Sequence, residues 1–160
     1  MIERLADRFT RAVERLVAYA LVLAVLVNFA NVVARYGFHR PLLGADELQV
    51  FLMVWMTFLG VVVVTWRRMH LRMDLVAERL PAPARAWLRL AEALATAALG
   101  ALVLGESCRY VAQMFAVGRR SDALGLPVWI PHASVAIAFG LIALIAVYRL
   151  ARRAARGPGT

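Results

Sequence analysis

Hydrophobic residues along this chain gather in four long runs, separated by short segments rich in arginine. The runs cover residues 17–33, 48–66, 93–105 and 128–148. A membrane-spanning helix needs about 20 mostly apolar residues, because each residue advances about 1.5 Å through a hydrocarbon core of about 30 Å. The pattern therefore predicts an all-α integral membrane protein, a single membrane domain over residues 1–160. Its four transmembrane helices are expected at about residues 15–35, 46–66, 87–117 and 128–150.

The third run is the shortest, and its flanking charges decide how far its helix extends. The run lies between Glu92 and Glu106, and Arg109 follows three residues after Glu106. Residues three apart share one helix face, so this pair can neutralise itself near a membrane boundary. We therefore expect a long or tilted span. The short spacing favours a structural ion pair, and a functional role of the pair is the alternative.

Composition agrees with a membrane protein, since 62% of the residues are hydrophobic and the mean hydropathy is +0.69. The net charge of +9 would suggest nucleic-acid binding in a soluble chain. Here the basic residues stand at the ends of the apolar runs, which indicates contact with the lipid bilayer and no nucleic acid.

The arginines also predict the orientation, because basic residues in short loops are retained on the cytoplasmic side. Fourteen of the nineteen arginines flank the start of the first span, the loop between the second and third, and the end of the fourth. Only five, Arg35, Arg40, Arg109, Arg119 and Arg120, belong to the opposite side. Both termini are therefore expected in the cytoplasm.

The segment "RRMHLRMD" follows the second run directly and fits a stop and orientation signal at the inner membrane edge. After it, Leu71, Leu75, Val76 and Leu80 share one side of a short amphipathic helix that should lie along the inner membrane surface. Pro81 and Pro83 should end that helix. The N-terminal 16 residues have the same amphipathic character, and they either rest on lipid or run straight into the first span.

Small and polar residues within the spans predict faces for helix association. Ala93, Ala97, Ala101 and Gly105 form a ladder at spacing four along the third span. Asn28 and Asn31 lie three apart in the first span, where each needs a hydrogen-bond partner. An interhelical hydrogen bond is the favoured role for these two, and an ion or substrate ligand is the alternative.

The residues of a catalytic, cofactor or metal site are missing from the pattern. His39, His70 and His132 lie on separate loops or boundaries without a carboxylate at helical spacing, which argues against a metal site or haem. Cys108 is the single cysteine and cannot form an intramolecular disulfide. With no phosphate loop or nucleophile motif either, we expect no enzyme activity and no cofactor.

The start of the second span carries Asp46 and Glu47, where the partial positive charge of a helix N-terminus favours carboxylates. A pairing of this acidic pair with Arg35 or Arg40 is a further possibility. Trp55 lies in the middle of the same span, away from the interfaces that tryptophan prefers, and is expected to face a protein partner.

An ordered set of short motifs resembles the small membrane subunit of tripartite ATP-independent periplasmic (TRAP) transporters, the DctQ-like family. The motifs are "NVVARYGF", the acidic "DEL", a tryptophan followed by "FLG", "RRMHLRMD", "LPAPAR" and "SDALGLPVWIPHA", and the similarity covers roughly residues 15–150. The resemblance implies a non-catalytic subunit of a bacterial inner-membrane symporter. It would scaffold a large multi-span subunit that takes up an organic acid delivered by a periplasmic substrate-binding protein.

Residue by residue, the resemblance marks ten positions as hypothetical contributors to subunit contacts or to the fold. They are Asn31, Arg35, Tyr36, Asp46, Glu47, Trp55, Gly60, His70, Asp74 and Pro127. Two other functions remain open. One is a self-sufficient four-helix carrier, with Glu92 or Glu106 as the transport group, and the other is a membrane anchor for an enzyme complex.

Overall fold

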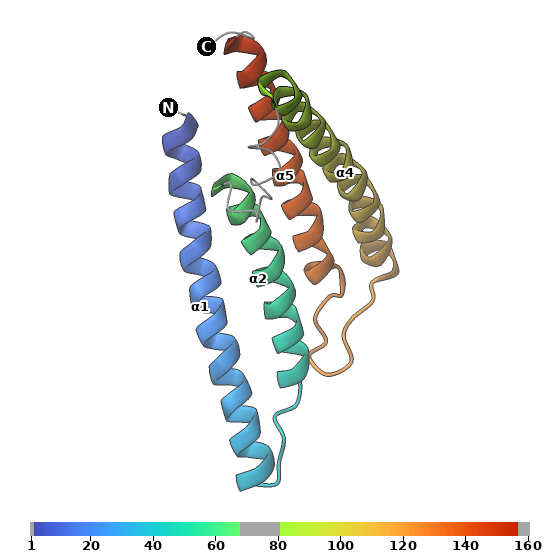
Figure 1. The fold of residues 1–160 in the computed structure, drawn as a ribbon. Coiled ribbons are helices and arrows are strands. Elements are labelled where there is room, and N and C mark those ends of the chain that lie inside the picture. The colour runs from blue at the N-terminus through green and yellow to red at the C-terminus, as the bar shows by residue number, and fades with distance from the viewer. Residues whose placement is uncertain (1, 68–80, 157–160) are drawn as a thin grey trace.

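The computed structural model describes residues 2–67 and 81–156, which form four long helices (Figure 1). They are α1 (Ile2–Gly37), α2 (Ala45–Arg67), α4 (Ala82–Val117) and α5 (Trp129–Arg156). By length and composition all four could cross a membrane, which confirms the all-α prediction with four candidate spans. The expected amphipathic helix, together with His70 and Asp74, lies outside the described residues.

The structure decides where two of the helices start. α1 is continuous from Ile2, so the N-terminal segment runs straight into the first span. α4 begins at Ala82, five residues before Trp87, with Pro83 in its first turn. Proline is tolerated there because the first backbone N–H groups of a helix have no intrahelical partner. Pro83 therefore lies inside the helix.

The helices form an open row in the order α1, α2, α5, α4 (Figure 1). α1 packs on α2, α2 packs on α5, and α5 packs most extensively on α4. Within the described part of the chain, α1 and α4 share no comparable contact, so the row does not close into a ring. Two broad helix faces are therefore left without cover from the chain itself.

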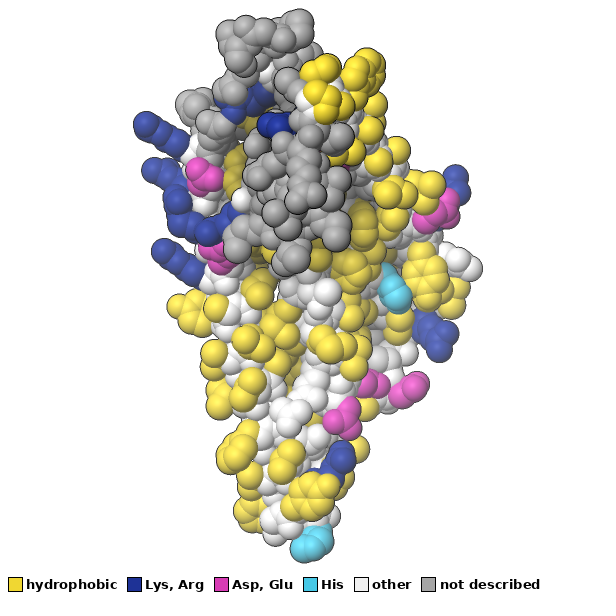
Figure 2. Space-filling view, viewed as in Figure 1, with side chains coloured by type: hydrophobic (Ala, Val, Ile, Leu, Met, Phe, Trp, Pro, Cys, Tyr) yellow, Lys and Arg dark blue, Asp and Glu magenta, His cyan; other side chains and the backbone are white. Residues whose placement is uncertain are grey.

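The small core lies between the two middle helices. Val62 of α2 and Ala138 and Ile142 of α5 are buried there, and Phe58 and Phe139 pack against them with ring centroids 6.3 Å apart. In the most apolar stretches of α1 and α4 only 6% of the residues are buried, compared with 22% in α2 and α5. Hydrophobic side chains consequently cover much of the visible surface (Figure 2). Such a surface suits lipid or a protein neighbour, not water.

The row has two distinct ends. We call the end with the chain termini and the last turn of α2 the terminal end, and the end with the connections 38–44 and 118–128 the loop end (Figure 1). Polar contacts between different helices gather at these two ends. The ends, more than the thin core, fix how the helices lie relative to one another.

Two glycines mark a close approach of α4 to α5. A side chain added at Gly100 would place its Cβ 3.2 Å from the Cβ of Ala143, and one at Gly140 would meet Leu104 at 3.4 Å. Gly105, the last residue of the predicted small-residue ladder, has nothing within 4 Å of that position. The close contact inside the chain thus uses a neighbouring stripe of α4.

We predict that Gly100→Leu separates α4 from α5, whereas Gly105→Leu leaves the purified chain intact. Overfilling a tight contact typically costs about 1–3 kcal/mol, and at Gly100 the backbone of α5 lies in the way. The measurement is the apparent melting temperature of the purified chain in detergent. Equal melting temperatures for the two variants would show that the α4–α5 contact is not close-packed at Gly100.

Candidate functional site

Asn31 joins α1 to the start of α2 at the loop end. Its side chain is buried, its Nδ2 donates to Oδ1 of Asp46 at 3.1 Å, and its Oδ1 accepts from the backbone N–H of Leu42 at 3.1 Å. One amide group therefore satisfies a carboxylate on the next helix and a backbone donor in the connecting loop. The role is the interhelical hydrogen bond that the sequence favoured, and Asn28 by contrast is exposed.

Asp46 has a second partner on α1. Nη2 of Arg35 lies 3.5 Å from Oδ2 of Asp46, so Arg35 is the arginine that the acidic pair reaches. Both side chains keep substantial exposure, which limits the strength of this ion pair. Its effect is mainly to fix the angle between the last turn of α1 and the first turn of α2.

Glu47 connects α2 to the loop that precedes α5. Its Oε1 accepts from the N–H of Ala123 and its Oε2 from the N–H of Leu124, both at 2.9 Å. Hydrogen bonds to a charged carboxylate are about twice as strong as neutral ones. The acidic pair thus divides its work, with Asp46 binding α1 and Glu47 binding the connection 118–128.

The connection 118–128 is itself a compact turn. The backbone N–H of Ser121 donates to the carbonyl of Leu126 at 2.8 Å, and the Ser121 hydroxyl accepts from the Leu126 N–H at 3.2 Å. Arg120 and Pro127 form an isolated antiparallel bridge at its base. This internal structure holds the two N–H groups in place for Glu47.

A hollow of about 530 Å³ opens beside Glu47 between the start of α2, the end of α4 and the 118–128 connection. Its lining mixes charges of both signs, with Asp46, Glu47 and Asp122 facing Arg119 and Arg120. Tyr110 borders it, and the Tyr110 ring stands edge-on to His132 with centroids 4.6 Å apart. The hollow is open, and charges of both signs line it beside apolar side chains.

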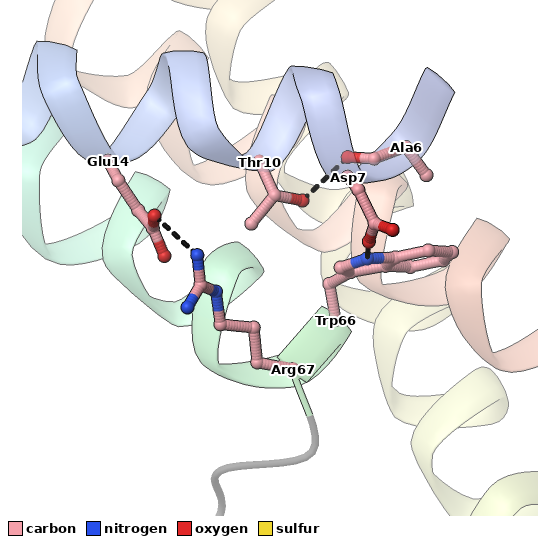
Figure 3. Close-up of polar contacts among 6 residues, drawn as sticks. All are labelled: Ala6, Asp7, Thr10, Glu14, Trp66 and Arg67. Carbon is pink, nitrogen blue, oxygen red and sulfur yellow. Dashed lines mark hydrogen bonds and ion pairs between the residues drawn. The ribbon is translucent and has the colours of Figure 1, made fainter. Parts of the chain in front are cut away.

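At the terminal end, two acids of α1 hold the last turn of α2 (Figure 3). Asp7 accepts from the indole N–H of Trp66 at 2.8 Å, and Glu14 accepts from Nη2 of Arg67 at 2.6 Å. The two acids lie seven residues apart and therefore on one face of the helix. Thr10 lies between them in Figure 3, and its hydroxyl donates to the carbonyl of Ala6 at 2.8 Å.

Arg149 of α5 completes the terminal end. Its Nη2 donates to the carbonyls of Thr65 and Trp66 at 2.7 and 2.8 Å. The last carbonyls of a helix lack intrahelical donors and carry partial negative charge, so a guanidinium is a favourable partner. Trp66 also stacks near Tyr148 with centroids 6.3 Å apart. α1, α2 and α5 are tied together at this end.

The ten marked positions fall into three groups. Asn31, Arg35 and Asp46 are in direct contact, Glu47 lies beside them, and Pro127 pairs with Arg120 in the loop that Glu47 holds. Tyr36 is exposed on the last turn of α1, Trp55 is half-buried in α2, and Gly60 has open space where a side chain would begin. His70 and Asp74 are beyond the described ranges.

Sequence reasoning missed Asp7, Glu14 and Arg149. Asp7 and Glu14 carried no prediction, and Arg149 was counted only as an orientation signal. A usable signal existed in the spacing of the acids, because two carboxylates seven apart mark one helix face. No pattern pointed to Arg149, since its partners are backbone carbonyls.

The chemistry of both ends is interhelical attachment. The contacts described for Asp7, Glu14, Asp46, Glu47 and Arg149 each join two different elements. In the described ranges, no three His, Cys, Asp or Glu residues come together as a metal site. The arrangement is suited to holding four helices in a fixed row.

Comparison with known proteins bears on the same question. Residues 24–156 match the family described as tripartite ATP-independent periplasmic transporters, DctQ component. The chain is 28% identical over 131 residues to the ectoine TRAP transporter small permease protein TeaB of Halomonas elongata, covering 79% of this chain and 68% of that protein.

Two further relatives have other names and lengths. The C4-dicarboxylate TRAP transporter small permease protein DctQ of Vibrio cholerae is 32% identical over 104 residues, which are 64% of this chain and 45% of that protein. The isethionate TRAP transporter permease protein DctMQ of Oleidesulfovibrio alaskensis is 28% identical over 136 residues, 81% of this chain and 21% of that protein. The matched region thus spans less than half the length of these two relatives.

Proposed function

The chain belongs to the DctQ family, the small permease component of TRAP transporters, and we propose that it braces a large multi-span subunit during ion-coupled solute uptake. It is a transporter component and not an enzyme. In this proposal the large subunit carries the solute and the coupling ion. The small subunit supplies a fixed flank with no chemistry of its own.

The open row of helices is the observation that carries this proposal. A self-contained carrier needs helices that enclose a pathway, whereas here the outer helices α1 and α4 keep their apolar stretches almost entirely uncovered. The buried Asn31 attaches α1 to α2, whereas the buried hydroxyls of Thr10, Thr65 and Ser134 donate to carbonyls of their own helices. A neighbouring protein packed on the uncovered faces of α1 and α4 would stabilise such a row.

The isethionate relative is named the permease protein DctMQ, and this chain matches only 21% of its length. A protein that combines both parts supports association of this chain with a large permease. We extend the proposal to a periplasmic substrate-binding protein as the third component, because the family is described as tripartite and periplasmic.

We further propose that the chain lies in a bacterial inner membrane with the terminal end in the cytoplasm. The arginines at that end support this orientation through the retention of basic residues inside the cell. The loop end, with Glu47 and the hollow beside it, would then face the periplasm. His70 and Asp74 would lie on the cytoplasmic side, as would the amphipathic helix, and their part in subunit contact stays a hypothesis.

The solute is a proposal at the level of chemical class. The relatives are named for ectoine, C4-dicarboxylates and isethionate, which are small organic solutes. We propose that this chain serves the uptake of such a solute, and an organic acid is the first class to test. Nothing within the described helices acts as a solute-binding group in this proposal.

The test is co-expression of the tagged chain with the large permease encoded beside it, followed by purification in detergent and reconstitution. We expect the two to purify together, and solute uptake to require both with the binding protein. Uptake by the small chain alone would establish the self-sufficient carrier. Purification with an oxidoreductase in place of a permease would establish the enzyme anchor.

A further inference from the structure

An ion pair interrupts the apolar outer surface of α4. Nη1 of Arg109 donates to Oε1 of Glu106 at 2.8 Å, and the side chains are 80% and 64% exposed, respectively. Each residue lies within a helix long and apolar enough to span a membrane. The question is what covers these charges when the chain is in its bilayer.

The depth of the pair follows from contacts between neighbouring helices. Leu104 faces Gly140 of α5, and Tyr110 faces His132, so Glu106 lies level with the stretch of α5 between them. That stretch includes Phe139, which packs on Phe58 near the middle of α2. Glu106 is therefore level with a part of α5 that lies inside its candidate span, beyond the first turn, and Arg109 lies closer to the start of that span.

The direction of the pair follows from helix geometry. With about 100° per residue, Glu106 and Arg109 point about 120° and 180° away from Gly100, where an added Cβ would lie close to α5. Leu99 and Leu102 on the same outer side are more than 60% exposed. Figure 2 shows charged side chains set among hydrophobic ones along the edge that α4 forms.

Lipid tails are a poor cover for this surface. The internal ion pair cancels the net charge, yet it uses only one of the five N–H donors of Arg109 within the described chain. The remaining donors and the second carboxylate oxygen need partners, since no water is present in the hydrocarbon core. Ionisable groups at such depth almost always face a protein interior or a water-filled cavity.

We propose that a transmembrane helix of the large permease subunit packs on the outer face of α4 and offers polar side chains to Glu106 and Arg109. The inference rests on the proposed function, which supplies the large subunit as the neighbour. Within the described chain, Glu106 and Arg109 form an exposed ion pair inside a candidate span, on the outer face of α4. The pair therefore determines at which depth and in which orientation a partner helix can pack on this face. Leu99 and Leu102 supply the apolar contact.

The test is a charge exchange, Glu106→Arg combined with Arg109→Glu. The exchanged side chains can still form an ion pair with each other. If the pair has no role beyond neutralising its own charges, assembly with the large subunit should therefore be unchanged. If polar groups of a partner contact the two charges, the exchange places each charge against groups that suit the opposite charge. We expect the large subunit that copurifies to fall at least about tenfold, a change equivalent to about 1.4 kcal/mol.

The matched control exchanges the interhelical pair at the terminal end, Glu14→Arg with Arg67→Glu, and should keep copurification within about twofold because the pair is retained inside the chain. Normal copurification of the α4 exchange variant would overturn the inference. If wild-type chain fails to copurify with the large subunit, the proposed function fails instead.

A photo-crosslinking residue at Leu102 provides a test that leaves both charges in place. We expect an adduct with the large subunit in native membranes, at a yield severalfold above that from the same residue at the exposed Tyr19 of α1. This measurement decides the matter if the charge-exchange variant does not accumulate. Adducts only with a second copy of the chain, or only with lipid, would overturn the inference.

Discussion

Replacing Gly44 with alanine is expected to cause one of the largest losses of stability of any single substitution in this protein. Gly44 has a positive φ of 81°, and a Cβ there would lie 2.4 Å from Cδ2 and 2.6 Å from Cγ of Leu124. The left-handed backbone costs alanine about 1–2 kcal/mol, and overfilling adds about 1–3 kcal/mol. The side chain of Leu124, a residue of the loop that Glu47 holds, must therefore move away from residue 44.

The measurement is the apparent melting temperature of the purified chain in detergent, compared with Gly118→Ala. Gly118 has a positive φ of 65° and nothing within 4 Å of the Cβ position, so it pays only the backbone cost. The difference between the two variants isolates the crowding by Leu124. A Gly44→Ala variant as stable as Gly118→Ala would mean that the two loops do not pack as described.

A double-mutant cycle with Leu124→Ala tests the cause directly. If crowding is the reason, Gly44→Ala should cost clearly less when residue 124 is already alanine, because the colliding atoms are gone. Additive effects of the two substitutions would assign the whole loss to the backbone of Gly44. This cycle also probes the contact between the first connection and the last.

The four helices could be predicted because membrane burial imposes a strong and simple pattern on the sequence. A run of about 20 apolar residues forms few stable structures other than a membrane-spanning helix. The start of α4 was less predictable, because Pro83 reads as a helix stop although proline is accepted in a first turn. The open order of the helices was not predictable, since a small-residue face such as the ladder of the third span does not identify the helix that packs on it.

The contacts at the loop end were predictable only in part. Asp46 and Arg35 carry opposite charges near a common turn, so their pairing could be foreseen as a possibility. The partners of Glu47 are backbone N–H groups more than 70 positions later, and every residue except proline has such a group. The amino-acid types at positions 123 and 124 therefore could not predict that contact.

The same reason explains the omission of Gly44 and Arg149. Gly44 is needed for its backbone conformation and for the space that Leu124 fills, and neither property produces a periodic signal. Arg149 was counted for its charge, while its function in the fold is to bind two carbonyls at the end of α2. Contacts to the backbone between distant segments have to be seen in three dimensions.

Asn31→Leu is expected to lower stability while Asn28→Leu leaves it unchanged or raises it, although both residues lie on α1 three positions apart. Asn31 is buried and bonds both Asp46 and the N–H of Leu42, whereas Asn28 is exposed on the spanning helix. Removing one partner of a buried hydrogen bond costs about 1–3 kcal/mol. An exposed asparagine in a membrane span gives up little when leucine replaces it.

The two leucine variants form a matched pair, since the chemical change and the helix are the same and only the surroundings differ. Their melting temperatures in detergent should move apart, with Asn31→Leu below wild type by several degrees. Equal shifts would show that Asn31 has no special role between α1 and α2.

Asn31→Asp sharpens this comparison. It keeps an acceptor for the N–H of Leu42 but loses the donor to Asp46 and sets a second carboxylate at the place of the 3.1 Å contact. Like charges at that distance repel, so at neutral pH this variant should be less stable than Asn31→Leu. If Asn31→Asp is as stable as Asn31→Leu, the two side chains do not lie in contact, and Arg35 is the α1 residue that holds Asp46 at this end.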